Sequence, residues 1–200
     1  MRRYFLILQL LALLTTLHFG SYAQAVDTVS IVRLRHQEAP LGRKLLRAEL
    51  IGLGAQGATT GLLFVLPRDF TNWSLDSARY TFKEAWTKPP VFDHDSWVFN
   101  YAAHPYSGAF MYNTMRSQGA KPLPSYLFAT GQSLIWEFMI ESWVERPSIQ
   151  DLIITSNLGS LLGEAIHRAT LRMKRNGFTT VEKFFVIVSN PAYCINNGLK

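Results

Sequence analysis

The chain has 200 residues, of which 48% are hydrophobic, 13% aromatic and only 17% charged, with a formal net charge of +6. This length suits a single domain, and the high apolar fraction indicates either a large buried core or contact with lipid. Cys194 is the only cysteine, which excludes an internal disulfide. Nucleic acid is not an expected partner, because the chain has no aromatic and basic recognition motif.

Residues 1–25 have the three parts of a secretory signal peptide. Arg2 and Arg3 form a basic start, residues 4–17 are mainly apolar, and the small residues within 21–25 suit a cleavage site. The alternative is an uncleaved membrane anchor, although the apolar run is short for a span of about 20 residues. We therefore expect an exported protein, periplasmic or membrane-associated.

A flexible lead-in is expected over residues 26–40, followed by a single helical domain over residues 41–200. Residues 50–66 carry no charge, which places this segment at the lower length limit for a membrane span. Gly57 and Gly61 have the spacing at which helices approach one another closely. The segment is predicted either as a buried or membrane-dipping helix or as a true span.

The remaining pattern predicts an all-α fold, a bundle of about five helices. A helix over about residues 75–86 is followed by the core of the domain, residues 93–175, which contains three longer helices. We expect these at about residues 96–117, with a bend after His104 caused by Pro105, at 125–145 with Ser125 as its cap, and at 149–175 with Ser148 as its cap. Residues 181–188 are predicted as a helix or a strand.

Each core helix carries polar or small residues at four-residue spacing, which places them on one face of the helix. The stripes are Asn100, His104, Gly108 and Tyr112; Ser133, Glu137, Glu141 and Glu145; and Asp151, Thr155, Gly159 and Gly163. The short turn at residues 146–148 makes the second and third helices antiparallel neighbours. We therefore expect a polar cluster made of Asn100, His104, Glu137, Glu141 and Asp151.

His104, Glu137 and Glu141 are the candidate ligands of a divalent metal, with Asp151 as an additional candidate. Imidazole together with carboxylates suits zinc, iron or manganese, and a single ion requires the three side chains to converge within about 5 Å. The alternative is a buried network of hydrogen bonds and ion pairs that fixes the helix register, with Arg116 or Arg146 as the partner.

The third core helix carries two further features. Glu164 and His167 have the Glu-x-x-His spacing of metal-binding bundles, but a surface pair with Arg168 is the preferred interpretation. Basic residues near the end of the same helix favour the helix dipole, and they could also meet anionic lipid headgroups. These residues are Arg168, Arg172, Lys174 and Arg175.

Four motifs in this order resemble one bacterial family, the domain of unknown function 3943. They are N-Y-x-x-H-P-x-x-G at residues 100–108, W-E-x-x-x-E at 136–141, P-S-x-x-D at 147–151 and G-x-x-x-G-E at 159–164. The resemblance covers roughly residues 75–198. It implies an exported protein of a Gram-negative envelope and does not bring a biochemical activity with it.

Two functions are compatible with these features. The first is a membrane-associated structural or scaffold protein, whose partner is membrane lipid or another envelope protein and whose polar stripes serve helix packing. The second is a metal-dependent hydrolase that uses His104, Glu137 and Glu141 on an envelope lipid or glycan. No familiar catalytic motif of hydrolases or phosphate-binding proteins is present to decide between them.

Overall fold

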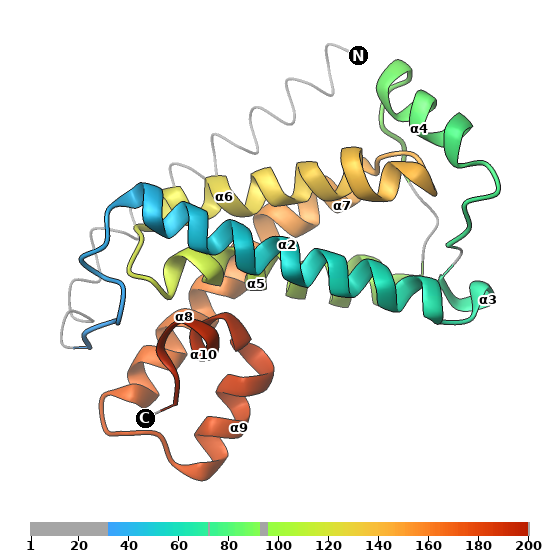
Figure 1. Ribbon diagram of the computed structural model, residues 1–200. Coiled ribbons are helices and arrows are strands. Elements are labelled where there is room, and N and C mark those ends of the chain that lie inside the picture. The colour runs from blue at the N-terminus through green and yellow to red at the C-terminus, as the bar shows by residue number, and fades with distance from the viewer. Residues whose placement is uncertain (1–31, 72, 93–95, 200) are drawn as a thin grey trace.

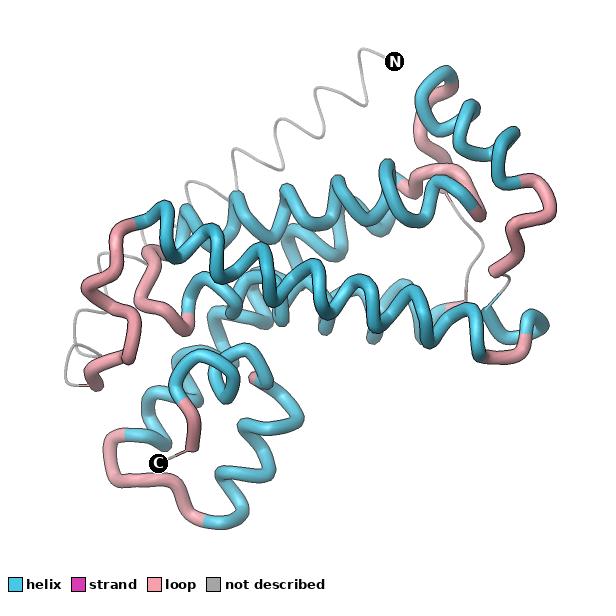
Figure 2. Tube along the Cα trace, viewed as in Figure 1, coloured by secondary structure: helices cyan, strands magenta, loops and turns pink. Residues whose placement is uncertain are grey.

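The computed structural model describes residues 32–71, 73–92 and 96–199, and these residues form an all-α protein (Figures 1 and 2). The predicted fold class is therefore confirmed. Within the described ranges β pairing is limited to an isolated bridge between Val91 and Ser148. The predicted signal peptide and residues 26–31 of the lead-in lie outside the described residues.

The bundle is built from a long helix, three composite helices and several shorter ones. The long helix is α2 (Leu41–Val65), and the short helices α3 (Arg68–Thr71) and α4 (Ala78–Thr87) follow it. The composite helices are η2 (Phe99–Ala103) with α5 (His104–Arg116); α6 (Pro122–Ile135) with η3 (Trp136–Ile140) and η4 (Glu141–Trp143); and α7 (Ile149–Ile153) with η5 (Ile154–Leu158) and α8 (Gly159–Lys174). The chain ends with α9 (Thr180–Ser189) and α10 (Pro191–Asn197).

Each composite helix contains one π-helical segment, namely η2, η3 or η5. A π turn closes i→i+5 hydrogen bonds and therefore holds an extra residue. Pro105 stands two residues after η2, at the second position of α5, so the helix continues through the proline by way of a π turn. The sequence predicted a bend after His104, and the structure has the π turn η2 directly before this residue.

Several predicted helix ends are confirmed and one is wrong. Ser148 caps α7 by accepting a hydrogen bond from the Asp151 amide at 3.1 Å, and the last apolar segment is helical as α9. Ser125 does not cap a helix. α6 begins three residues earlier, at Pro122, and the Ser125 hydroxyl donates to the Lys121 carbonyl. The two prolines of the Pro-Leu-Pro sequence are pre-organised for a first helical turn, which explains the earlier start.

The composite helices of α5 and α8 cross at glycine. A Cβ on Gly108 would lie 2.0 Å from the Thr155 carbonyl oxygen, and one on Gly159 would lie 2.7 Å from the Gly108 Cα. Gly163 is equally constrained, because its Cβ would lie 2.9 Å from the Tyr112 ring. The backbones thus approach one another closely at Gly108 and Gly159, and this contact sets His104 beside Thr155.

α2 packs with its small and polar side inward and its leucines outward. Its buried residues, at four-residue spacing, are Lys44, Ala48, Gly52 and Gln56, whereas Leu46 and Leu50 are 62% and 65% exposed. Gly57 and Gly61 are not at a helix contact, because a Cβ at either would meet nothing within 4 Å among the described residues. Within the part of the chain that the structure describes, Gly57 and Gly61 thus make no helix contact, and Gly52 is the glycine of α2 that faces α5 and α6.

Asparagine side chains fasten the C-terminal helices α9 and α10 to the bundle. Asn190 donates to the Thr170 hydroxyl at 3.0 Å, and Asn196 donates to the Ser117 hydroxyl at 2.8 Å. A small apolar core supports them, made of Leu34, Leu171, Val186 and Tyr193. In Figure 1 these helices lie below the α2 and α6 layer, next to α8.

Candidate metal centre and adjoining cavity

The three composite helices bring one histidine and two carboxylates together. His104, Glu137 and Asp151 each offer a ligand atom, and these atoms all lie within 4.8 Å of one another. His104 stands directly after η2, Glu137 lies within η3, and Asp151 precedes η5 by three residues. π-helical segments occur frequently at functional sites, and here one stands at or beside each member of the cluster.

Hydrogen bonds orient the side chains of this cluster. The His104 Nδ1 lies 3.0 Å from the Thr155 hydroxyl, while its Nε2 lies 3.6 Å from Asp151 Oδ1. The Glu137 Oε2 accepts from the Ser148 amide at 2.8 Å, at the N-terminus of α7, where a negative charge is favoured. Ser148 therefore positions both acids, since its hydroxyl also accepts from the Asp151 amide.

Glu141 does not join the cluster that the sequence predicted. Its Oε2 accepts a hydrogen bond from the Trp136 indole at 2.7 Å. The four-residue step from Glu137 to Glu141 places two residues on one face of an α-helix, but η3 is a wider π turn and η4 a tighter 3₁₀ turn. Asp151 takes the place that the α-helical spacing gave to Glu141.

The surroundings of Glu141 favour its protonated form. The side chain is buried, and burial raises its pKa well above the usual value, with the nearby negative charges of Glu137, Glu145 and Asp151 adding to the effect. Glu141 is thus an acid that lies beside the cluster without the negative charge of its neighbours.

The remaining predicted member, Asn100, is buried within η2. The two arginines proposed as structural partners of the acids are engaged elsewhere. Arg116 pairs with Glu164 at 2.8 Å, and Arg146 donates to the Pro89 carbonyl and lies 4.0 Å from Glu84.

Glu164 and His167 are buried, so the predicted surface pair is wrong. Glu164 accepts hydrogen bonds from Tyr112, Arg116 and Arg168 at 2.7 to 2.8 Å. Burial opposes ionisation of this carboxyl, but the bonds and charge of Arg116 prevail and lower its pKa to about 2. Burial, and then Arg116, lower the pKa of His167 to about 3, which keeps the imidazole neutral. This group forms a structural ion pair in the middle of the bundle.

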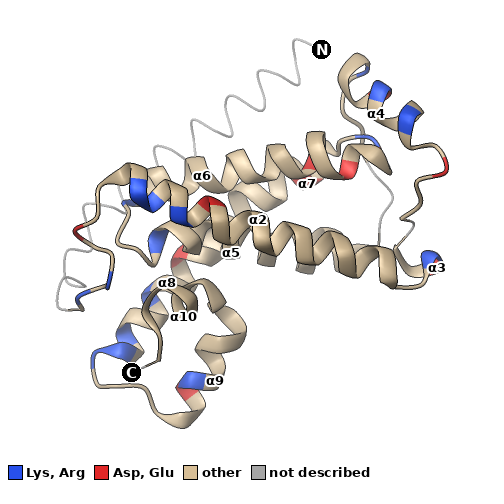
Figure 3. Ribbon diagram, in the orientation of Figure 1, with Lys and Arg blue, Asp and Glu red and all other residues tan. Residues whose placement is uncertain are grey.

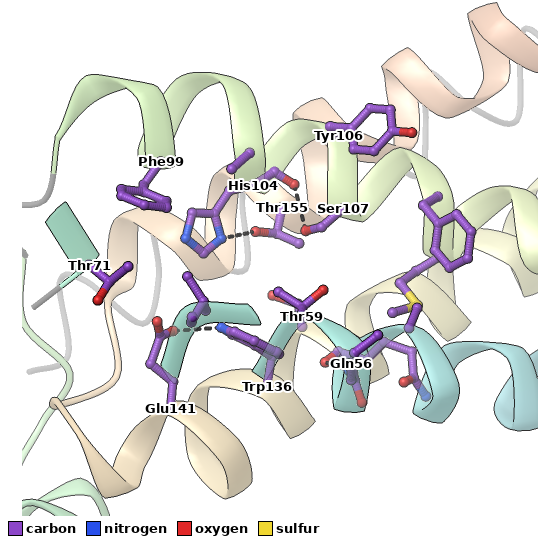
Figure 4. A pocket seen from close by; sticks show the side chains of 18 of the residues that line it. Gln56, Thr59, Thr71, Phe99, His104, Tyr106, Ser107, Trp136, Glu141 and Thr155 are labelled. Atoms are coloured by element: carbon purple, nitrogen blue, oxygen red, sulfur yellow. Dashed lines mark hydrogen bonds between the residues drawn. The ribbon is translucent and has the colours of Figure 1, made fainter. Parts of the chain in front are cut away.

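A cavity of about 480 Å³ adjoins the cluster. It lies between α2, α5 and α6, and His104 belongs both to its wall and to the cluster. Figure 4 shows the His104 ring and the Glu141 carboxyl on the side where Thr71 and Phe99 lie, with Thr59 and Gln56 further along. Cavities of this size accommodate small ligands, so a molecule bound here would lie against His104.

The arrangement of the cluster suits a divalent cation. Histidine and carboxylate ligands bind zinc, manganese or iron, and a metal-binding histidine normally holds its other ring nitrogen against an oxygen, as Thr155 does for His104. Ligand bonds near 2 Å separate the ligand atoms by about 3 to 4 Å, which small side-chain rotations would reach. Three protein ligands would leave a position for water or substrate.

Sequence reasoning missed several residues of this site. Thr155 and Ser148 were expected only as a stripe member and as a helix cap, and Trp136 only as part of the W-E-x-x-x-E motif. The cavity residues on α2 were also missed, because the predicted stripes were limited to the three core helices. A similar four-residue spacing in the sequence marks the inward face of α2, which consists of Lys44, Ala48, Gly52 and Gln56.

The fold and the cluster define a helical-bundle protein with a buried histidine and carboxylate centre beside a cavity. Residues 89–192 match the model of the family described as a domain of unknown function, DUF3943. The match covers more than half of the chain, so the chain belongs to this family, as its motifs predicted. No curated protein and no solved structure matches it.

Proposed function

We propose that this protein is a membrane-associated, metal-dependent hydrolase of the cell envelope, with His104, Glu137 and Asp151 as the ligands of a divalent cation. The observation that carries this proposal is the convergence of the three side chains within 4.8 Å, from three helices, beside a cavity. Ionised carboxylates buried together repel one another and are costly without a cation or a proton.

The hydrolytic role follows from the chemistry of such a cation. A bound metal lowers the pKa of its water and polarises the substrate. A cation held by His104, Glu137 and Asp151 would supply this chemistry for the displacement of a leaving oxygen by water, and the leaving oxygen would need a proton. Glu141 lines the same cavity as His104, which makes it the acid placed to supply this proton.

Membrane association is supported by the outward faces of the helices. Soluble proteins rarely expose large contiguous apolar surfaces, yet leucines point outward from α2, α6 and α8 while polar residues are buried between these helices. Among the described residues, α2 is the one helix long and apolar enough to cross a membrane. Export to the envelope rests on the signal-like sequence of residues 1–25.

Metal analysis of the purified full-length chain, with titration of Zn²⁺ and Mn²⁺ by calorimetry, tests the proposal. We expect about one bound ion per chain, and an affinity at least about tenfold weaker in His104→Ala, Glu137→Gln and Asp151→Asn, because each change removes a ligand. Glu145→Gln is the matched control, since it removes an acid close to Glu141 that is outside the cluster, and its metal affinity should stay unchanged.

A different result would favour the structural alternative. If the native protein binds neither ion and the three variants lose only stability, the cluster is a hydrogen-bonded network that fixes helix register. The protein would then have the role of a membrane-associated scaffold.

A further inference from the structure

The wall of the cavity is mainly carbon. Its apolar side chains come from α2, from η2 with α5, and from Trp136, and they include Ala55, Leu63, Phe99, Phe110 and Met111. Gln56 and Gln132 also line it, but their amide nitrogens bond to the Gln132 carbonyl and to Glu49. A glycan needs hydrogen-bonding partners along its length, whereas most of the cavity wall is apolar even with the hydroxyls of Thr59, Ser107 and Ser133 included.

The polar groups that face the cavity from the catalytic side gather in one region. His104 and Thr155 are hydrogen-bonded to each other, and the Glu141 carboxyl lies below them in Figure 4. Thr71 lies at the same end. A molecule with one polar end and one apolar end therefore matches the cavity, with its polar end at His104.

α2 is shared between the cavity and the outer apolar surface. Ala55 and Thr59 line the cavity, while Leu46, Leu50 and Leu53 on the same helix are exposed. Figure 3 shows a stretch of α2 and α6 without charge, with lysine and arginine near the ends of α2. An apolar chain that leaves a bilayer along α2 would reach the cavity without crossing a charged surface.

We propose that the cavity binds an acyl chain of a membrane lipid, with the polar part of the lipid at His104 and Glu141. The inference rests on the proposed hydrolase function. It narrows the substrate class of that hydrolase to lipids and excludes glycans. Binding of the chain itself does not require the metal, because the apolar wall lies apart from Glu137 and Asp151.

Photolabelling of the full chain in vesicles tests this inference. The probe is a phosphatidylethanolamine that carries a diazirine near the end of one acyl chain, and the labelled residues are mapped by peptide mass spectrometry. We expect labels on cavity residues of α5, such as Phe110 and Met111, in addition to the outward leucines of α2. Labels confined to the outward leucines would overturn the inference.

Two adjacent threonines of α2 provide a matched pair of variants. Thr59 lines the cavity and Thr60 does not. Thr59→Phe should fill part of the cavity and lower the labelling of Phe110 and Met111 about tenfold, because the larger side chain takes up space that the acyl chain needs. Thr60→Phe should leave the labelling of these two residues unchanged. Unaltered labelling of the α2 leucines in both variants would show that the variants are folded. Equal loss of cavity labelling in both variants would reject the proposed binding of the acyl chain in the cavity.

Measuring both metal binding and cavity labelling distinguishes a failure of this inference from a failure of the proposed function. Cavity labelling without any metal binding would leave lipid binding intact and reject the hydrolase. Metal binding without cavity labelling would leave the metal centre intact and reject a lipid as its substrate.

Discussion

His167 is a buried base held without charge. Its side chain is 1% exposed, and neither ring nitrogen has a hydrogen-bond partner among the described residues. Arg116 and Arg168 lie on the same network through Glu164, so a proton on His167 would add a third positive charge to a buried group. The imidazole therefore fills space between the helices as a neutral group. Its contribution to the free energy of unfolding depends on pH.

We expect His167 to make the folded state less stable as the pH falls below about 6.5. The pKa of His167 is lowered from 6.5 to about 3 in the folded protein, so the unfolded chain takes up a proton first. The contribution is fully present above pH 6.5 and declines by about 1.4 kcal/mol for each pH unit below it. Thermal unfolding of the wild type and of His167→Asn measures this contribution as the difference between the two proteins.

This difference is most informative between about pH 6.5 and 4.5, where Glu164 does not yet titrate, because its folded pKa is about 2. Other titrating groups, including Glu141, are common to both proteins and cancel. A stability difference that stays constant over this interval would mean that His167 is not held neutral.

The helix crossing at Gly108 is the element-scale feature that places the candidate centre. Gly108→Ala should lower the free energy of unfolding by about 1 to 3 kcal/mol, because its Cβ would lie 2.0 Å from the Thr155 carbonyl oxygen and the two helices would have to move apart. The same separation moves Thr155 away from His104, so metal affinity should fall as well. Chemical unfolding and metal titration measure the two effects.

Gly131→Ala is the control for this prediction, because it makes the same change within α6 where a Cβ would meet nothing within 4 Å among the described residues. It should leave stability unchanged or raise it by up to about 1 kcal/mol, since alanine favours the helix. Equal destabilisation by the two changes would contradict a specific role for the Gly108 contact.

Helix positions and stripes could be predicted from the sequence, because they depend on local chemistry. Ser148 as a cap, the glycines at 159 and 163, and the helical nature of each segment follow from rules that act within a few residues. The choice between Asp151 and Glu141 could not be predicted in this way. It depends on the π turn at residues 136–140, and the packing of neighbouring helices decides where such a turn forms.

At the scale of the whole molecule, the distribution of side chains supports the proposed association with a membrane. The residues buried between helices include serine, threonine, asparagine and glutamate, while large apolar side chains lie on the outside. Small and polar residues are typical of helix contacts inside membranes. The sequence left open whether residues 50–66 form a buried or membrane-dipping helix or a true span, and in the structure Leu50, Leu53 and Leu62 of this segment are exposed.

We expect the protein to stay with the membrane fraction during carbonate extraction. Leu50→Lys combined with Leu53→Lys should release it, because each lysine costs about 2.5 to 3.5 kcal/mol at the centre of a bilayer. Gly42→Lys is the control, since it adds a positive charge next to Arg43 and Lys44 at the basic end of α2. Complete release of the wild-type protein would contradict membrane association.

The π turns have a consequence for how this site tolerates changes in chain length. An α-helical residue turns the chain by about 100°, so the loss of one residue from η5 would rotate Asp151 away from His104 while Gly159 stayed on Gly108. The same holds for η3 and Glu137. The candidate centre thus depends on residues of η3 and η5 that are not ligands, and a single-residue deletion in either segment would dismantle it even with every ligand retained.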